Sequence, residues 1–300
     1  MNVIWVAEDI RKDGSFTQTK AELMCTVSCV LFIKHYYPDF KRIFFVDNFT
    51  KEYYNRLGVL DLFDEVNDTL LNEPINIDKD IFWAASKILA QRITPGPTVT
   101  FDLDFRIYDD ISKFGAFDGD VGCLWLEDIN NEFYGSPKNL LKYPRLDWDF
   151  DWGINALNVS FLYLKNEEFK NLYCDYALEF MKSSYNRIPK NLDRVQNNKF
   201  ILFIEQYMLY QLSLVHNQTV KLLIDDFYPI RDINIKSCGI TMNTCGNYFY
   251  HFGDHKKMMM EDYGFYNNEV NRCYEITNQH ITNKNDLDIF NNICKLKVTI

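Results

Sequence analysis

Short apolar segments alternate with longer segments of helical periodicity along the first third of the chain. In the longer segments the apolar residues recur at helical spacing, and each segment stops at a breaker: Pro38, Gly58 or Pro95-Gly96-Pro97. The short segments have the length of buried strands. The predicted strands cover residues 2–8, 41–48, 62–66 and 98–105, and the predicted helices cover 21–37, 50–58 and 81–93.

The second half of the chain has a less regular pattern. After residue 264 it is polar and rich in asparagine, with a closing helix expected near 285–294. The pattern shows no internal repeat and no linker, and the best candidate for a domain boundary is the loop at 130–150. The predicted strands here cover residues 121–128, 156–165, 220–226 and 247–253, and the predicted helices cover 167–184 and 199–215.

Alternating strands and helices predict an α/β fold with a mostly parallel central sheet flanked by helices and a smaller mixed C-terminal half. In open sheets of this kind, ligands bind at the carboxyl ends of the strands. A set of acidic residues falls at such ends: Glu8, Asp9, Asp47, Asp102 and Asp104. The edge of the sheet that carries them is therefore the predicted ligand site.

Composition narrows the classes of partner. The net charge is −10, which argues against a nucleic-acid partner, because such binding needs a basic face. No apolar run is long enough to cross a bilayer, so no integral membrane segment is expected. The start, MNVIWVAEDIRKDG, does not resemble a secretory signal, and the expected location is the cytoplasm. The eight cysteines form no CxxC pair, and we expect buried free thiols.

The stretch TVTFDLDFRIYDDI raises a chemical question, because a buried strand has no use for two carboxylates. If Asp102 and Asp104 lie two residues apart on a strand, they point the same way and repel each other. A divalent metal relieves this repulsion, and Mg²⁺ or Mn²⁺ on carboxylates commonly holds a diphosphate. The alternative is that both are solvated loop carboxylates. Similar acidic clusters occur at Asp109-Asp110, Asp118-x-Asp120 and Asp147-x-Asp149-x-Asp151.

Several segments resemble GT-A glycosyltransferases, in the order that this family shows. FWAASKILAQRITPGPTVTFDLDFRIY resembles their helix–strand–Asp-x-Asp unit, and GINALNVSFLYLKNEEFKNLYCDYALEFM resembles the strand and helix that form the floor of the sugar pocket. FIEQYMLYQL resembles the acidic-Gln helix, and YHFGDHKK resembles the late loop that carries a histidine metal ligand. The resemblance covers roughly residues 1–260, and it includes bacterial and viral GT-A-like proteins.

The resemblance implies a GT-A, Rossmann-like domain over residues 1–265, with a nucleotide-binding half at 1–110, a sugar and acceptor half at 111–265 and a C-terminal extension at 266–300. It also implies Mn²⁺ or Mg²⁺ bridging a nucleotide-sugar diphosphate. Asp104 would bind the metal directly, and Asp102 the ribose or the metal. The late motif departs from the family's His-x-x-Gly-x-x-Lys, so His251 and His255 both remain candidates for the third ligand, with His251 taken as the first.

Basic and acidic residues nearby receive roles from the same resemblance. Lys87 and Lys256 are expected to face the diphosphate, and Lys257 is an alternative to Lys256. Asp47 is the first candidate for a contact to the nucleobase or ribose, and Glu8 and Asp9 are the alternatives. For each lysine the alternative is an ordinary solvated side chain.

The sugar side of the site has its own candidates. Asn155 and Asn158 are expected to bind sugar hydroxyls, unless they serve a tight turn with Gly153. Glu205 and Gln206 are polar residues in an apolar helix, and a buried Glu205 needs a partner. Together with Asp151 they are the catalytic candidates. The acidic-aromatic loop that holds Asp151 also contains Asp147, Trp148, Asp149 and Trp152, and it is either a lid over the sugars or a plain polar loop.

These features predict a glycosyltransferase that moves a sugar from a nucleotide-diphosphate donor, UDP-linked, to a hydroxyl on a glycan, lipid-linked or protein acceptor. A genuine late His loop favours retention of configuration, whereas inversion would need a base among Asp149, Asp151 and Glu205. The alternatives are a catalytically weak or inactive GT-A-like protein that binds nucleotide or sugar, and a metal-dependent nucleotidyltransferase or phosphohydrolase. AEDIRKDGSFTQ, with a single glycine, is a poor phosphate loop for a nucleotidyltransferase.

Overall fold

The computed structural model describes residues 1–72, 76–129, 151, 153–184, 186–189, 192, 194–224, 249–251 and 263–296, of which 194–196, 249–251, 263–266 and 269 by their backbone alone. The chain divides into two compact units. Unit 1 comprises Met1–Asn72, Phe101–Lys113 and Ile233–Ile300, and unit 2 comprises Glu73–Thr100 and Phe114–Asp232. The division at residues 110 and 265 that the sequence suggests stays a prediction.

The main sheet has seven strands in the order β10-β6-β9-β4-β1-β2-β3. β1 pairs with β2, β2 with β3 and β6 with β10 in parallel, and β6 pairs with β9 antiparallel. The predicted α/β class with a mostly parallel sheet is therefore confirmed. The strands are β1 Asn2–Ala7, β2 Lys41–Val46, β3 Glu65–Asn67, β4 Thr98–Phe101, β6 Val121–Cys123, β9 Phe161–Leu164 and β10 Val220–Leu222.

Two smaller ladders complete the strands: β5 Phe105–Ile107 pairs antiparallel with β11 Phe249–His251, and β7 Leu126–Glu127 with β8 Ala156–Leu157. The predicted strands at 121–128 and 156–165 are each split in two. The split arises at Asn158, whose backbone N–H donates to the Trp125 carbonyl (2.9 Å) and whose carbonyl accepts from the Leu124 N–H (3.0 Å). The register shifts there, from Cys123 opposite Leu162 to Leu126 opposite Leu157.

The core of unit 1 forms around aromatic residues of its strands. Trp5 of β1 stacks on Phe101 with ring centroids 5.6 Å apart, and Phe44 of β2 stacks on Phe63 at 4.5 Å. The apolar, β-branched and aromatic runs of β1 and β2 are typical of strands buried on both faces. The sequence pattern therefore predicts both the strands and their burial.

Helix α1 (Lys20–Tyr36) of unit 1 begins at a capping box. The N–H of Glu22 donates to the Thr19 hydroxyl (3.2 Å), and the Glu22 carboxylate accepts from the Thr19 N–H (2.9 Å). The helix ends before Pro38, which cannot continue it. Every residue from Leu23 to Ile33 is buried, as expected for a helix covered on more than one side.

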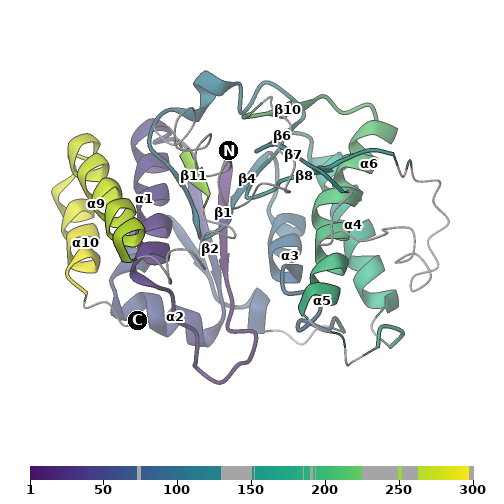
Figure 1. Cartoon of the computed structure of the whole chain (residues 1–300), viewed down its shortest axis with the longest axis horizontal. Coiled ribbons are helices and arrows are strands. Elements are labelled where there is room, and N and C mark those ends of the chain that lie inside the picture. Colours follow the sequence, from purple (N-terminus) through teal and green to yellow (C-terminus); the bar gives the residue numbers. More distant parts are fainter. Residues whose placement is uncertain are drawn as a thin grey trace. The chain divides into compact units, whose positions relative to one another are not determined.

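Two C-terminal helices, α9 (Tyr263–His280) and α10 (Lys284–Cys294), pack against α1 (Figure 1). The hydroxyls of Ser28 and Thr277 share a hydrogen bond of 3.2 Å, and Lys34 pairs with Asp286 at 2.9 Å. The closing helix predicted at 285–294 is confirmed. Helix α9 was not predicted, because its Asn-rich sequence has low helix propensity and its packing on α1 decides its structure.

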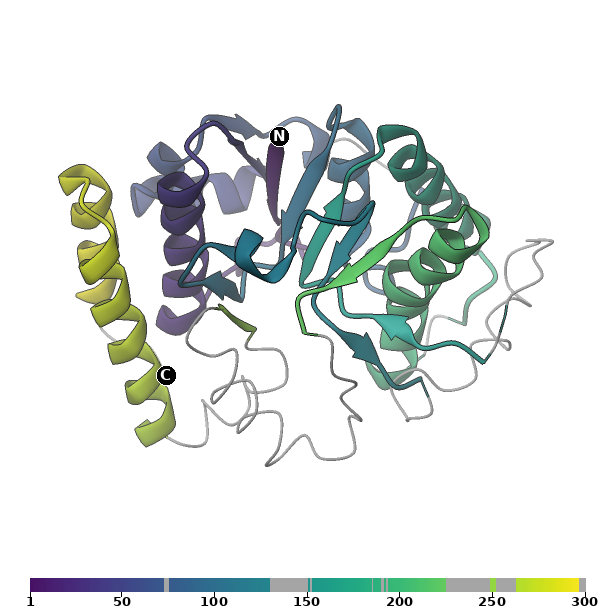
Figure 2. The ribbon, with the colours of Figure 1, turned by 90° about the horizontal axis from the view of Figure 1, so that it is seen from above.

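The remaining helices lie in both units. α2 (Asn48–Arg56) follows β2 in unit 1. In unit 2, α4, α5 and α6 lie along one face of β6, β9 and β10 (Figure 2). The helices of unit 2 are α3 Ala85–Ile93, α4 Glu167–Ser184, α5 Arg194–Leu202, a π-helical turn Phe203–Tyr207 and α6 Met208–Val215. Short 3-10 turns occur at Val59–Leu62, Leu70–Asn72 and Ile111–Phe114.

Two further expectations concern the whole chain. The described cysteines are all free thiols, and all but the half-buried Cys294 are buried, as expected; Cys238 and Cys245 lie outside the described residues. Among the described helices, none combines the length and the apolar character that crossing a membrane requires.

Candidate active site

Asp47 ties together the carboxyl ends of β1 and β2 in unit 1. The register pairs Ala7 with Val46, so the residues after both strands emerge at one edge. The N–H of Asp9 donates to Oδ2 of Asp47 (3.1 Å), and the N–H of Thr50 donates to Oδ1 (2.8 Å), which caps α2. Asp47 is only 1% exposed, and both its oxygens bind the chain itself. These contacts shape the edge, and a role for Asp47 at a nucleobase stays a prediction.

The loop after β1 is fixed by its own polar groups. Oδ2 of Asp9 accepts from the N–H of Gly14 (2.7 Å), and the Lys12 ammonium donates to the Leu71 carbonyl (3.2 Å). Gly14 has φ +77°, a left-handed conformation that favours glycine. The single glycine of AEDIRKDGSFTQ therefore allows a turn in which its N–H binds the Asp9 carboxylate. The Glu8 side chain is 4% exposed and lies 3.9 Å from the Lys12 ammonium.

The segment Asp102-Leu103-Asp104 forms a turn between β4 and β5. The N–H of Phe105 donates to the Asp102 carbonyl (3.1 Å), and the hydroxyl of Thr26 in α1 donates to the Leu103 carbonyl (2.8 Å). Asp104 is 8% exposed, and Asp102 is half-buried. The prediction of one strand over 98–105 is wrong here, because local turn bonds replace the ladder after Phe101. Strand periodicity therefore gives no argument for where the two carboxylates point.

The pairing of β11 with β5 brings a histidine next to this turn. The register aligns His251 with Phe105 and Tyr250 with Arg106. The backbone of His251 thus lies opposite the residue that follows Asp104, although the two are far apart in sequence. The candidates His255, Lys256 and Lys257 lie outside the described residues.

Arg106 supplies a buried positive charge near Asp104. It is 1% exposed, and its guanidinium carbon lies 4.8 Å from the centroid of the Tyr108 ring, a cation–π geometry. Burial raises the pKa of the Cys25 thiol in α1, Arg106 opposes that rise, and Asp104 adds to it. Both charges therefore act on the same buried thiol. Sequence reasoning missed Arg106, although a charged residue inside the apolar stretch FRIY was the available signal.

The donor set around the turn fits Mg²⁺ or Mn²⁺, since these ions prefer carboxylate oxygens and keep positions open for phosphate. Asp102 and Asp104 supply two carboxylates, and the register brings the backbone of His251 beside them. Among the side chains that the structure describes, which do not include that of His251, no three His, Cys, Asp or Glu are grouped as metal ligands. The metal role of these three residues stays a prediction.

Unit 2 pairs two predicted site residues with each other. Lys87 of α3 forms an ion pair with Oε1 of Glu205, and their side chains are only 9% and 4% exposed. Glu205 lies in the π-helical turn, and such turns often occur at functional sites. The partner that a buried Glu205 needs is thus Lys87. A role for Lys87 at a diphosphate stays a prediction, and its ammonium is already held by a carboxylate.

Asn158 is the centre of a buried polar network in unit 2. Its amide donates to Oε1 of Glu127 (2.7 Å), which also accepts from the Trp125 indole (2.8 Å). Its own Oδ1 accepts from the Ser160 hydroxyl (2.7 Å). Sequence reasoning missed Trp125 and Glu127. The available signal was that two side chains able to form hydrogen bonds lie two residues apart, which places them on the same face of a strand. Asn155 is half-buried just before β8.

Asp151 is anchored to the helix that carries Glu205. Its carbonyl accepts from the Tyr207 hydroxyl (2.7 Å) and the Gln211 amide, and its N–H donates to Oε1 of Gln211 (3.1 Å). Burial raises the pKa of Tyr207 to about 12, so this hydroxyl remains a donor at neutral pH. The Asp151 side chain is exposed, and Gln206 beside Tyr207 is half-buried. The candidates Asp147, Trp148, Asp149 and Trp152 lie outside the described residues.

The other acidic clusters bond to nearby residues. Asp109 pairs with Lys113 (2.9 Å), and Asp120 accepts from the N–H of Thr219 (3.0 Å). Oδ1 of Asp110 accepts from the Tyr37 hydroxyl and from the Ser112 hydroxyl, the latter at 2.6 Å. These bonds account structurally for Asp109, Asp110 and Asp120.

Asp110→Asn is expected to lower the free energy of unfolding at pH 7 by about 1 kcal/mol, a typical value for bonds to a partly exposed charge. Burial alone would raise the pKa of Asp110, but the hydrogen bonds from Ser112 and Tyr37 outweigh it, so the folded pKa is lowered. A lowered pKa stabilises the fold above the unfolded value, near 4, and this contribution is lost as pH falls through the folded value.

Urea unfolding of wild type and variant between pH 7 and pH 3 measures this dependence. The difference between them should be constant down to about pH 5 and shrink below pH 4. Asp39→Asn, which changes an exposed carboxylate, is the control and should leave the curve unchanged. A difference that stays constant to pH 3 would contradict the assignment.

Comparison with known proteins gives likenesses in structure only. No protein-family model matches the chain, and no curated protein does. A galactosyltransferase, LgtC, solved with donor and acceptor sugar analogues, is similar with a TM-score of 0.40 and 14% identity, over 69% of this chain and 71% of that one. Mouse xyloside xylosyltransferase 1 has a TM-score of 0.40 and 10% identity, over 74% and 85%.

A nucleoside-diphosphate-sugar pyrophosphorylase from Vibrio cholerae is also similar, with a TM-score of 0.37 and 12% identity, over 76% of this chain and 92% of that one. The glycosyltransferases among these structures are of the GT-A type that the sequence resembles. All of these likenesses are distant, and they assign no donor, metal or reaction to this chain.

The predicted residues lie in both units. In unit 1, Asp47 follows β2, Asp102 and Asp104 lie in the turn after β4, and the backbone of His251 is in register with Phe105, the residue after that turn. In unit 2, Lys87 and Glu205 form one pair, Asn158 has its own network, and Asp151 is tied to the helix of Glu205 and Gln206.

Proposed function

We propose that this protein is a metal-dependent glycosyltransferase that moves a sugar from a nucleoside-diphosphate donor to a hydroxyl acceptor. The observation that carries the proposal is the turn after β4, where Asp102 and Asp104 follow a buried strand and His251 of β11 lies in register with Phe105, the residue after Asp104. Two carboxylates and a histidine at strand ends suit a cation that binds phosphate oxygens.

A cation held by Asp102 and Asp104, with His251 as the candidate third ligand, would offset the negative charge on the departing diphosphate. The chain's own contribution is to keep these ligands in place. Thr26 fixes the Leu103 carbonyl of the turn, and Arg106 places a positive charge near Asp104. UDP is the nucleotide that we expect in the donor, and Lys256 remains a proposed contact to its phosphates.

For the sugar we propose contacts from unit 2. Gln206 and Asn155 are half-buried polar side chains, suited to hydroxyl groups, whereas Asn158 holds its neighbours in place. Asp151 is the better candidate for a base, because its side chain is exposed while Glu205 is ion-paired with Lys87. Glu205 is then a positioning residue. The acceptor is proposed to be a glycan, a lipid-linked sugar or a protein hydroxyl.

The test is product release from a panel of nucleotide sugars that includes UDP-glucose, UDP-galactose, UDP-N-acetylglucosamine and GDP-mannose. Each is incubated with the full chain in Mn²⁺, in Mg²⁺ or in EDTA, with and without simple sugar acceptors. The expected result is metal-dependent release of nucleoside diphosphate from one donor, together with free or transferred sugar.

Other products would overturn the proposal in different ways. Release of nucleoside monophosphate or pyrophosphate would indicate nucleotidyl or phosphohydrolase chemistry. Donor binding by calorimetry without turnover, with or without acceptor, would indicate a binding protein. Turnover that EDTA leaves unchanged would remove the metal from the mechanism.

A further inference from the structure

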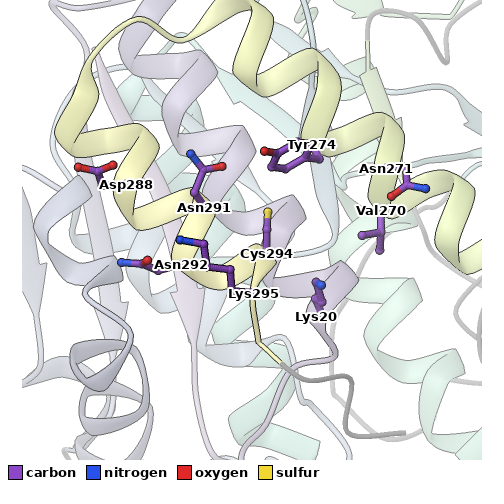
Figure 3. Close-up of a pocket in the computed structure, with 9 residues that line it drawn as sticks. All are labelled: Lys20, Val270, Asn271, Tyr274, Asp288, Asn291, Asn292, Cys294 and Lys295. Carbon is purple, nitrogen blue, oxygen red and sulfur yellow. The ribbon is translucent and has the colours of Figure 1, made fainter.

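A polar pocket of about 610 Å³ lies in unit 1, between the start of α1 and the helices α9 and α10 (Figure 3). Lys20 comes from α1, Tyr274 from α9, and Asn291 and Cys294 from α10. None of the residues proposed for the metal or the nucleotide lines it. The volume is within the range of small-molecule sites and far exceeds that of a single phosphate ion.

The pocket contains three charged side chains. Lys20, Lys295 and Asp288 line it, and together they carry one excess positive charge in a chain whose net charge is −10. In the part of the chain that the structure describes, none of these three side chains forms an ion pair or a hydrogen bond. Other lysines of unit 1, such as Lys34 with Asp286, form ion pairs with carboxylates.

Amide groups add to the unsatisfied polar surface. Asn271, Asn291 and Asn292 line the same pocket, and the Oδ1 atom of Asn291 is buried without a hydrogen-bond partner among the described residues. A buried polar atom left without a partner is costly, and a bound ligand is one way to satisfy it. Amides both donate and accept, as recognition of sugar hydroxyl groups requires.

Tyr274 gives the pocket an aromatic surface. Its side chain is 44% exposed, which is high for a large ring in a helix that packs on its neighbours. An aromatic ring with an apolar body and a polar tip, next to amides and a carboxylate, suits the mixed apolar and polar faces of a sugar ring. The pocket therefore combines a sugar-like surface with a positive charge.

We propose that the pocket between α1, α9 and α10 binds a small anionic sugar, that is, a monosaccharide carrying one phosphate or carboxylate group. Lys20 and Lys295 neutralise the anionic group, Asn291 and Asp288 bond to hydroxyls, and Tyr274 packs on the ring. The site is additional to the proposed donor site and does not depend on the protein being a glycosyltransferase.

The experiment is calorimetric titration of the full chain with glucose 1-phosphate, glucuronate, glucose and inorganic phosphate, all in EDTA. We expect glucose 1-phosphate or glucuronate to bind with a Kd of about 1 mM or tighter. Glucose and inorganic phosphate should each bind at least about tenfold more weakly, because glucose lacks the anionic group and phosphate lacks the sugar ring. The preferred anion tells phosphate from carboxylate.

Variants assign the binding to this pocket. Lys20→Gln and Tyr274→Ala are each expected to weaken it about tenfold, whereas Lys284→Gln, which changes an exposed lysine of α10 outside the pocket, should not change it. Asp104→Asn should also leave it unchanged, which separates this site from the donor site. No binding of either anionic sugar, equal binding of inorganic phosphate, or binding that survives both pocket variants would overturn the proposal.

Discussion

Asp104→Asn is expected to reduce metal-dependent release of nucleoside diphosphate by at least about a hundredfold, the size of loss seen when a group that stabilises transition-state charge is removed. Asparagine keeps the shape of the side chain but removes a negative charge and one strong metal-binding oxygen. Because Asp104 is nearly buried in a turn that local hydrogen bonds hold, the backbone should stay in place. Asp102→Asn should weaken activity less if it contacts the ribose as well as the metal.

The chain contains its own control for this substitution. Asp118-x-Asp120 is another Asp-x-Asp, yet Asp118 is exposed and Asp120 bonds to Thr219, so Asp118→Asn should leave activity unchanged. A second readout avoids dependence on turnover: Mn²⁺ should raise the Tm of wild type and of Asp118→Asn, and it should not raise that of Asp104→Asn. Equal Mn²⁺ stabilisation of all three proteins would place the metal elsewhere.

Lys87→Met and Glu205→Leu are each expected to lower the free energy of unfolding by about 3–5 kcal/mol. Each substitution removes the ion pair that the other, nearly inaccessible charge makes in unit 2. Chemical denaturation at pH 7 measures the loss. This loss of folding stability should be larger than any loss of ligand binding caused by removing the same side chain.

The double variant Lys87→Met/Glu205→Leu should recover most of that stability, because two apolar side chains of similar volume replace both charges. The comparison pair is Lys113 and Asp109, whose side chains are 58% and 23% exposed; it should contribute no more than about 1 kcal/mol in the same cycle. If the single variants were nearly as stable as wild type while donor turnover fell, Lys87 would act at the diphosphate, as the sequence predicts.

Local sequence patterns were sufficient for the elements whose boundaries are set by nearby residues. The strand predicted at 2–8 and the helix predicted at 21–37 are observed at 2–7 and 20–36, and the helix ends before Pro38 as predicted. Helix α4 has the predicted bounds of 167–184. In each case the propensity, the period and the boundary residues favour the same structure, so the sequence was a reliable guide.

The elements that the sequence did not predict depend on partners far along the chain. The sequence predicts one strand over 98–105, but the hydroxyl of Thr26 in α1 stabilises a turn inside it, and β11 pairs with the segment after the turn. Similarly, α9 lacks helical propensity and is specified by contact with α1. Single-sequence periodicity contains no information about either contact.

The candidate site shows the same division. The position of acidic residues at strand ends follows from topology, so Asp102 and Asp104 could be found from sequence. The apolar residues around Glu205 predicted that its carboxylate needs a partner, but they did not identify that partner as Lys87. Arg106 and Glu127 were missed because a buried charge is recognised only when its neighbours in space are known.

The discontinuity of unit 1 has a consequence for protein synthesis. Ser28 and Thr277 are 249 positions apart, and Lys34 and Asp286 are 252 positions apart. On a ribosome, all residues assigned to unit 2 are translated by Asp232, before the helices that cover α1 exist. Unit 1 therefore begins first and is completed last. The apolar surface of α1 stays uncovered until nearly the whole chain has been synthesised. Chaperones and low temperature at that stage would raise the yield of folded protein.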